Sequence, residues 1–429
     1  MPALSLSLLF ATALVLRLAT QTWLSTRQMR HVAQHRGAVP SAFAATVPLQ
    51  AHQRAADYTL AKGRFGLLTA AFGSAVLLAW TLLGGLDALN GIVRDAVQPR
   101  WGDMAYQLAL VAAFGVIGGL LELPFDLYAT FRIEQQFGFN RTTLRLFLLD
   151  MVKGVAVGMV IGLPLLALIL WIMQATGSVW WLWAWGAWAL FNLLLMVLYP
   201  TLIAPLFNKF EPLADEDLKT RVQGLMRRCD FAAKGLFVMD GSKRSAHGNA
   251  YFTGLGAAKR VVFFDTLLAK LSPGEVEAVL AHELGHFKHK HVPKRIVMMF
   301  GLSLAGLALL GWLAGQSGFY LGLGVAPNMS APNHALALLL FLSAVPVFGF
   351  FVSPLSALLS RRHEFQADAY ACQQSSAADL SSALLKLHED NASTLTPDPV
   401  YVRFYHSHPP PSERLAALGA PALPAVQPA

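Results

Sequence analysis

Residues 152–173 read VKGVAVGMVIGLPLLALILWIM, a stretch with a single charged residue. A helix of about 20 mostly apolar residues is long enough to cross the hydrocarbon core of a bilayer. The whole 429-residue chain has this character, since 55% of its residues are hydrophobic, 14% are charged, and its mean hydropathy is +0.48. Ordinary soluble domains carry about 25% charged residues. The composition therefore excludes a disordered or fibrous chain, argues against a wholly soluble enzyme, and predicts a multi-span membrane protein.

Six further segments have the length and apolarity of membrane spans. The predicted fold is an all-α polytopic membrane protein with seven transmembrane helices, plus a soluble region that contains a small β-hairpin or sheet. The first segment might be a cleaved signal peptide, but it lacks a basic start, carries Arg17 in its apolar run and has no small-residue cleavage site after it, so we interpret it as a span. The predicted spans are Leu4–Leu24, Phe65–Leu86, Met104–Leu121, Val152–Met173, Trp180–Ile203, Ile296–Ala314 and Leu336–Leu358.

Lys and Arg are distributed unevenly between the predicted loops. They are dense after the first and third spans, whereas the turn 176–178 and the loop 316–334 have none. The positive-inside rule then places the N-terminus outside and the C-terminus in the cytosol. The net charge of +8 is explained by this topology. We therefore expect the lipid bilayer, and no nucleic acid, as a partner.

Polarity divides the chain into five parts. Two long segments are polar enough to be soluble, and both fall on the cytosolic side of the predicted topology. Two cysteines, Cys229 and Cys372, are too few for a disulfide framework. The predicted parts are 1–203 with five spans, 204–295 as a cytosolic catalytic segment, 296–360 as a helical hairpin, 361–418 as a second cytosolic segment, and 419–429 as a disordered tail.

Residues 282–286 read His-Glu-Leu-Gly-His, an H-E-x-x-H pattern that is rare by chance in this composition. A capping box that begins at Ser272 predicts the start of its helix, and apolar residues follow at helical spacing. On that helix His282 and His286 lie one turn apart on one face, where two imidazoles bind one Zn²⁺. Glu283 beside them can take a proton from zinc-bound water. The alternative is a pair of surface histidines on an amphipathic helix.

A third ligand is expected, because catalytic zinc usually has three protein ligands and one open position. The last two spans form a hairpin that returns the chain to the side of the H-E-x-x-H helix near Arg361. Just beyond, Glu364 and Asp368 are four residues apart and share a helical face. Glu364 can reach the metal, and Asp368 can orient a ligating imidazole. His363 is the rival ligand, and a solvated face with Asp368 paired to Arg361 or Arg362 is the alternative for the two carboxylates.

Several segments occur in the order found in a known family. The sequence resembles the membrane-integral zinc endopeptidases of the CAAX prenyl protease 1 type over nearly its whole length. The resemblance implies that Glu364 is the third ligand of one Zn²⁺ per chain. It also implies that the seven helices enclose a large chamber, with the zinc site near its cytosolic end. Besides H-E-x-x-H, the shared segments are Phe137-Gly138-Phe139-Asn140, Leu206-Phe207-Asn208-Lys209-Phe210, Asn249-Ala250-Tyr251-Phe252, Val262-Phe263-Phe264-Asp265-Thr266-Leu267, Glu364-Phe365-Gln366-Ala367-Asp368 and Ser407-His408-Pro409-Pro410.

The resemblance also suggests which residues hold the substrate. Residues 249–253 and 260–264 have strand character, with a Gly-containing turn between them. In similar zinc proteases such an edge strand pairs with the extended substrate, so Asn249, Ala250 and Tyr251 are candidate substrate-binding residues. The alternative is a purely structural hairpin.

His408 and Arg414 lie in a segment similar to the family's His-Pro-Pro region. There they are positioned to donate hydrogen bonds to the oxyanion of the tetrahedral intermediate or to the peptide backbone. The alternative is a capped, solvated C-terminal helix. The remaining histidines near these segments, His289, His291 and His406, are interpreted as surface residues.

The predicted function is hydrolysis of peptide or membrane-protein substrates by a membrane zinc endopeptidase, including prenylated CAAX-type peptides. Prenylation is chiefly eukaryotic, whereas this compact Ala- and Leu-rich chain without an ER retrieval signal favours a bacterial inner membrane over the endoplasmic reticulum. One alternative is an HtpX-type quality-control protease with the same zinc site. Another is a non-catalytic transporter or structural membrane protein, for which broken helices and ionisable groups in paired repeats are expected.

Overall fold

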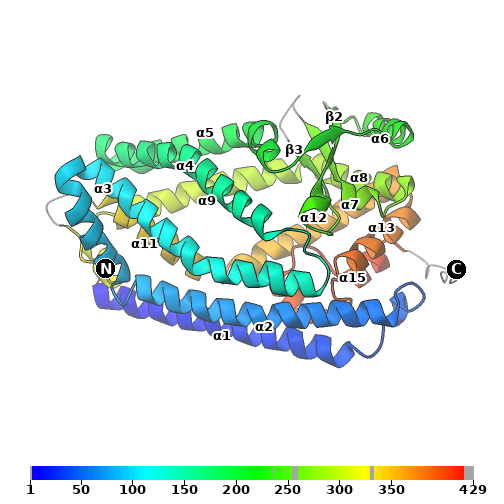
Figure 1. Ribbon diagram of the computed structural model, residues 1–429, viewed down its shortest axis with the longest axis horizontal. Coiled ribbons are helices and arrows are strands. Elements are labelled where there is room, and N and C mark those ends of the chain that lie inside the picture. The colour runs from blue at the N-terminus through cyan, green and yellow to red at the C-terminus, as the bar shows by residue number, and fades with distance from the viewer. Residues whose placement is uncertain (1, 234, 254–258, 329–332, 420–429) are drawn as a thin grey trace.

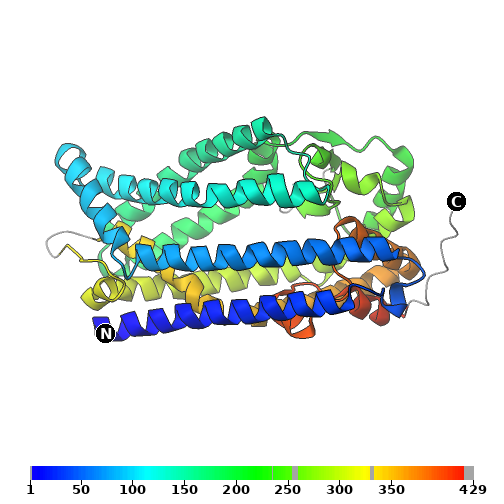
Figure 2. The same ribbon diagram turned by 60° about the horizontal axis from the view of Figure 1, so that its bottom comes forward.

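Long helices run lengthwise through the molecule, and a small sheet lies with shorter helices at one end (Figures 1 and 2). The computed structural model describes residues 2–233, 235–253, 259–328 and 333–419, so the predicted tail beyond Gly419 lies outside the described residues. The start of α1 (Ala3–His35) lies at the end of the molecule opposite α15 (Pro411–Ala417) (Figure 1). This placement at opposite ends is expected of a chain that crosses the membrane an odd number of times.

Among the described residues, six single helices are long and apolar enough to cross a membrane, and a bent pair of helices makes a seventh candidate. The predicted polytopic all-α fold is therefore confirmed. Helix α1 has 33 residues. At about 1.5 Å per residue its length is about 50 Å, against roughly 30 Å for the hydrocarbon core. The six helices are α1, α2 (Leu49–Trp80), α3 (Gly85–Tyr128), α4 (Leu144–Ala175), α5 (Trp180–Leu198) and α9 (His291–Leu313).

The second predicted span ends earlier than expected. We predicted a helix over Phe65–Leu86, but α2 stops at Trp80 and α3 begins at Gly85. Gly84 lies between them with φ +77°, a left-handed conformation that glycine adopts without steric cost. The prediction missed this turn because it was based on apolar composition alone.

The last predicted span, Leu336–Leu358, is not one continuous helix. It consists of α11 (His334–Gly349) and the first part of α12 (Ser353–Gln374), which are bent by 65° relative to each other. Pro354 has no N–H to donate to the carbonyl of Phe350, so it cannot continue the α-helical ladder and instead occupies the first turn of α12. The expectation of an unbroken seventh helix was wrong. The break occurs where the chain turns towards the functional site.

The spans bury few side chains along their middle portions. Helix α2 buries only His52, Ala55, Ala56 and Tyr58, all in its first third. Helix α4 buries only residues near its end: Leu170, Ile172 and Met173. A helix in a solid bundle buries a continuous stripe along one face. This burial pattern is the one expected of helices that surround a hollow interior.

A four-stranded sheet lies beside the site, in the order β1–β2–β4–β3. Its last two strands pair antiparallel with Ala250 opposite Phe263, which confirms the predicted hairpin, and β3 is the edge strand. The strands are β1 (Phe210–Pro212), β2 (Gly235–Met239), β3 (Ala250–Thr253) and β4 (Arg260–Phe264). The shorter helices are α6 (Glu216–Arg228), α7 (Asp265–Leu268), α8 (Pro273–Lys288), α10 (Ser317–Gly322), α13 (Ala377–Asp390) and α14 (Pro399–Tyr405).

Helix α8 begins with the predicted capping box. The Ser272 hydroxyl accepts from the Glu275 N–H, and the Glu275 carboxylate accepts from the Ser272 N–H. The same carboxylate accepts from the Ser382 hydroxyl at 2.6 Å and from the Lys386 ammonium at 2.8 Å, both on α13. The residue that starts α8 therefore also holds α13 against it.

Helices α8 and α12 approach each other most closely at Gly285. A Cβ at this position would lie 2.8 Å from the Cα and 3.0 Å from the carbonyl oxygen of Ala367. Backbone atoms cannot move aside as the end of a side chain can. Only glycine permits this helix spacing, and it lies between the two histidines of α8 and beside the carboxylates of α12.

We expect Gly285→Ala to force α8 and α12 apart, at a cost of about 1–3 kcal/mol in stability, the usual range for overpacking. The variant should melt at a lower temperature in detergent and retain less metal per chain. Gly301→Ala is the matched control, because no atom lies within 4 Å of a Cβ built there. Wild-type melting and metal content in Gly285→Ala would contradict the importance of the close contact.

Candidate active site

Helices α8 and α12 bring His282, His286 and Glu364 together. The ligand-type atoms of these three residues all lie within 4.8 Å of one another. The two Nε2 atoms are 3.3 Å apart. The carboxylate oxygens of Glu364 lie 3.5 Å from His282 Nε2 and 3.5 Å from His286 Nε2.

These distances fit a tetrahedral metal site. Ligand bonds of about 2.0–2.1 Å at the tetrahedral angle separate neighbouring ligand atoms by about 3.3–3.4 Å. Within the described part of the chain, Glu364 Oε2 is buried and makes no hydrogen bond, and a bound cation would satisfy such an atom. Two imidazoles and one carboxylate are also a donor set typical of catalytic zinc.

The second nitrogen of His282 faces Asp368. His282 Nδ1 lies 2.8 Å from Asp368 Oδ1, and Asp368 is only 2% exposed. Donation from Nδ1–H fixes the tautomer and leaves the Nε2 lone pair facing the donor cluster. Asp368 is therefore buried against His282 and does not lie on a solvated face. Arg361 instead donates to the carbonyls of Val402 and His406.

The surroundings of His282 and His286 shift the pKa values of the two imidazoles in opposite directions. Burial acts to lower the pKa of His282, but the hydrogen bond with Asp368 and the nearby carboxylate of Glu364 outweigh burial and raise that pKa to about 9. Burial, together with the neighbouring His282, lowers the pKa of His286 to about 4. Binding of a cation at this pair therefore competes with protonation of His282.

Arg414 lies behind the donor cluster. Its Nε donates to Asp368 Oδ2 at 2.8 Å, its Nη2 donates to Oδ1, and its Nη1 is 3.8 Å from Glu364 Oε2. The residue is 8% exposed. These contacts hold Asp368 in place, and Arg414 also lines the cavity over the donor cluster. The predicted role of Arg414 as a donor to the oxyanion or to the peptide backbone stays a prediction. Rotation of the guanidinium towards a substrate would leave the buried carboxylate of Asp368 without this charge partner.

His408 also reaches the donor cluster. Its Nε2 lies 3.5 Å from Glu364 Oε1, and its side chain is 66% exposed. His408 and Arg414 both line the cavity beside the cluster, and His408 is the more exposed of the two. The predicted role of His408 as a donor to the oxyanion or to the peptide backbone stays a prediction.

The segment that carries His408 is held by α14, which is fixed at both ends. At its start, Asp398 accepts from the backbone N–H groups of Val400 and Tyr401. The same carboxylate pairs with Arg27 of α1 at 2.9 Å. At its end, Arg361 of α12 donates to the last carbonyls. The C-terminal segment is thereby tied both to a membrane helix and to the helix that carries Glu364.

A cavity of about 370 Å³ lies over the donor cluster. Glu283 lines it, and burial raises the pKa of this carboxyl. Of the predicted substrate-binding residues, Asn249 and Ala250 line the cavity, whereas the described lining does not include Tyr251. The Tyr251 hydroxyl contacts Met239 instead, as expected when successive residues of a strand point to opposite faces. The apolar part of the lining consists of Leu267, Val279, Leu380, Leu384 and Leu387.

Two histidines near the site have positions that the sequence did not predict. His291 was expected at the surface, but it is 2% exposed and its Nδ1 lies 3.0 Å from His286 Nδ1. The available signal was that a second ligating imidazole also needs a partner. His388 of α13 lines the cavity, and burial lowers its pKa to about 4. A lone histidine carries no sequence signal for such a place.

The other histidines near the site differ in exposure. His289 is exposed as expected, and His406 is half-buried. The rival ligand His363 lies outside the three-donor cluster of the described residues. Its ring instead stacks on His291 at a centroid distance of 3.9 Å.

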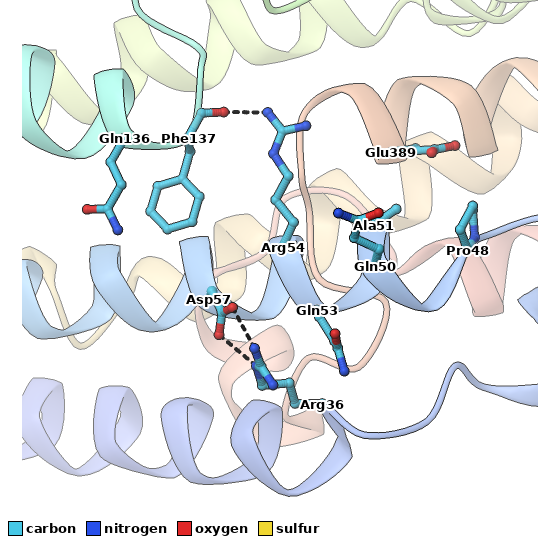
Figure 3. Close-up of a pocket in the computed structure, with 10 residues that line it drawn as sticks. All are labelled: Arg36, Pro48, Gln50, Ala51, Gln53, Arg54, Asp57, Gln136, Phe137 and Glu389. Atoms are coloured by element: carbon cyan, nitrogen blue, oxygen red, sulfur yellow. Dashed lines mark hydrogen bonds and ion pairs between the residues drawn. The ribbon is translucent and has the colours of Figure 1, made fainter.

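A larger cavity of about 670 Å³ lies elsewhere, between α2 and the end of α13 (Figure 3). Arg36 pairs there with Asp57, and Arg54 donates to the Phe137 carbonyl. Glu389 lines this cavity, while its neighbour His388 lines the one over the donor cluster. Size therefore does not identify the active site, because the metal-type donors lie at the smaller cavity.

The chain matches two adjacent family models. Residues 28–209 match the CAAX prenyl protease N-terminal domain with five membrane helices, and residues 212–422 match peptidase family M48. A CAAX prenyl protease 1 homolog of Arabidopsis thaliana is 34% identical, covering 93% of this chain and 94% of that protein. The human homolog is 32% identical, covering 93% and 92%. The predicted family resemblance is confirmed.

A solved structure shows the same fold. The crystal structure of S. mikatae Ste24p superposes with a TM-score of 0.91 at 29% sequence identity. The match covers 97% of this chain and all of the other, so the long helices and the site region are shared as one architecture.

We expect Asp368→Asn to weaken metal binding by about 10- to 100-fold, the usual range for a residue that orients a ligand. The variant removes the nearer of the two carboxylates that pair with the buried Arg414, so the melting temperature should fall as well. Asp217→Asn, on the exposed face of α6, is the control. Wild-type metal affinity and melting in Asp368→Asn would show that the carboxylate does not support His282.

Proposed function

Because this chain belongs to peptidase family M48, together with the CAAX prenyl protease 1 homologs, we propose that it is a zinc endopeptidase of the membrane that cleaves CAAX-type, prenylated peptides. The observation that carries the proposal is the cluster of His282, His286 and Glu364. Its distances of 3.3–3.5 Å already suit a tetrahedral ion. One Zn²⁺ per chain would be held by these three residues.

The chemistry follows from the residues around that cluster. Bound zinc supplies a Lewis acid and acidifies a water molecule. Glu283 accepts the proton of the attacking water and returns it to the nitrogen of the leaving amine. The raised pKa of Glu283 suits both proton transfers. A carboxylate of higher pKa is a stronger base towards the water, and it holds the proton better until the amine leaves.

His408 is the residue proposed to stabilise the developing oxyanion. Its imidazole is largely exposed and lines the cavity over the donor cluster. A hydrogen-bond donor aimed at the charge that develops in the transition state lowers the barrier most. Arg414 then acts through Asp368 and His282.

The substrate is proposed to bind as an extra strand on β3. This strand ends the sheet, so one edge is unpaired within the sheet, and Asn249 and Ala250 at its start line the cavity. Addition of a strand fixes the scissile bond by main-chain hydrogen bonds. The leucines that line the cavity provide an apolar surface for aliphatic side chains such as those of CAAX-type termini.

A quality-control protease would share the zinc site, but this chain covers almost the full length of the CAAX prenyl protease 1 relatives. A transporter or structural role receives little support. Helix breaks in transporters occur in paired repeats, whereas the one bent pair among the described spans leads directly to Glu364.

The catalytic end is proposed to face the cytosol. The basic loops lie at the same end of the molecule as the site: Arg36 and Arg54 lie beside α13 at the larger cavity, and Arg244 next to the sheet pairs with Asp150 of α4. Basic loops remain in the cytosol under the positive-inside rule.

Cysteine labelling tests this orientation. In a Cys229→Ser, Cys372→Ser background, a membrane-impermeant maleimide applied to intact cells should label Ser178→Cys and miss Lys243→Cys. Both positions are exposed, and they lie at opposite ends of the spans. Lys243→Cys should react only after permeabilisation. The reverse pattern would overturn the cytosolic placement.

Replacement of the base tests the catalytic proposal. We expect Glu283→Gln to keep its zinc and its melting temperature and to cleave a fluorogenic peptide at least about 100-fold more slowly, the lower end for loss of a general base. Wild-type protein treated with a chelator is the companion measurement, since it loses activity through the metal instead of the base. Near-normal turnover by zinc-loaded Glu283→Gln would refute the role of Glu283.

A further inference from the structure

His286 has a hydrogen-bond partner that none of the proposed roles uses. Its Nδ1 lies 3.0 Å from Nδ1 of His291. The Nε2 of His291 lies 2.9 Å from Oε1 of Gln366, on the helix that carries Glu364. His291 is 2% exposed, whereas Gln366 lies at an exposed position.

Only one arrangement of protons satisfies this chain of contacts once His286 binds a metal. Its Nε2 lone pair faces the donor cluster, so the neutral ring carries its proton on Nδ1 and donates it. Nδ1 of His291 must then be an acceptor, which leaves the His291 proton on Nε2. Nε2–H in turn donates to the Gln366 carbonyl oxygen, an acceptor. Each contact therefore has one donor and one acceptor.

The local backbone places His291 for this contact. Helix α8 ends at Lys288, and Lys290 adopts a left-handed conformation with φ +56°. This conformation is uncommon for a residue with a side chain. It turns the chain sharply, so that His291, the first residue of α9, lies back against the last turn of α8.

The ring of His291 is also held from its face. His363 of α12 stacks on it with a centroid distance of 3.9 Å and an angle of 13° between the planes. Two contacts to α12, the stack and the Gln366 hydrogen bond, therefore fix both the plane and the rotation of the imidazole.

We propose that His291, oriented by Gln366, is the positioning residue for His286 on the metal. The inference rests on the proposed zinc site. The two ligating imidazoles then differ in their hydrogen-bond partners. His282 donates to a carboxylate that is itself paired with Arg414, whereas His286 donates to a neutral imidazole. Loss of such a partner typically weakens metal binding by about 10- to 100-fold.

The test compares two substitutions in the full-length detergent-purified protein. His291→Phe keeps a ring of similar shape but has no acceptor. His291→Asn retains an acceptor oxygen close to the position of Nδ1. We measure the Zn²⁺ dissociation constant by competition with a chromogenic chelator, and the melting temperature of the metal-free protein. His35→Phe, at an exposed position at the end of α1, is the matched control, because the ring of His289 stacks on His291.

We expect His291→Phe to weaken Zn²⁺ binding by about 10- to 100-fold, His291→Asn to recover most of the loss, and the control to bind as wild type. Gln366→Leu should weaken binding less than His291→Phe, because it acts through His291. Equal weakening by Phe and Asn, with equally lowered metal-free melting temperatures, would reduce His291 to a packing residue. Unchanged affinity in His291→Phe would also overturn the inference while leaving the zinc site intact. Wild-type protein that binds no Zn²⁺ would instead remove the proposed function, and this inference with it.

Discussion

The close contact between α8 and α12 at Gly285 is the constraint on which the site depends. The two histidines of α8 and Glu364 of α12 belong to segments about eighty residues apart, and neither helix alone offers three donors. Contact between helix backbones at Ala367 places the carboxylate of Glu364 3.5 Å from the Nε2 atoms of both histidines. A side chain at position 285 would push α8 and α12 apart and so move Glu364 away from the two histidines.

The membrane helices help to position α8 and α12 for this contact. Helix α9 leaves the site and α11 returns, and the bend before α12 directs Glu364 towards α8. Helix α14 is tied to α1 through Asp398 and Arg27, and to α12 through Arg361, so that the segment of His408 closes over the cavity. The soluble and membrane parts therefore share their supports, and a span that shifts would displace a site residue.

Local patterns determined how much was predictable. Hydropathy over about 20 residues identified the spans, the capping box marked the start of α8, and a four-residue spacing put Glu364 and Asp368 on one face. Features that depend on distant contacts were missed. Nothing local to Arg414 reveals that Asp368 occupies two of its nitrogens, and nothing local to His291 reveals that α12 covers it. The break before Pro354 was missed because hydropathy does not register a missing N–H.

X-ray absorption at the zinc edge of the purified protein tests the central claim most directly. A site made by His282, His286 and Glu364 predicts one zinc per chain with only nitrogen and oxygen neighbours, at about 2.0–2.2 Å, and the multiple scattering of two imidazoles. A sulfur neighbour at about 2.3 Å, a spectrum with no imidazole contribution, or protein that takes up no zinc would contradict it.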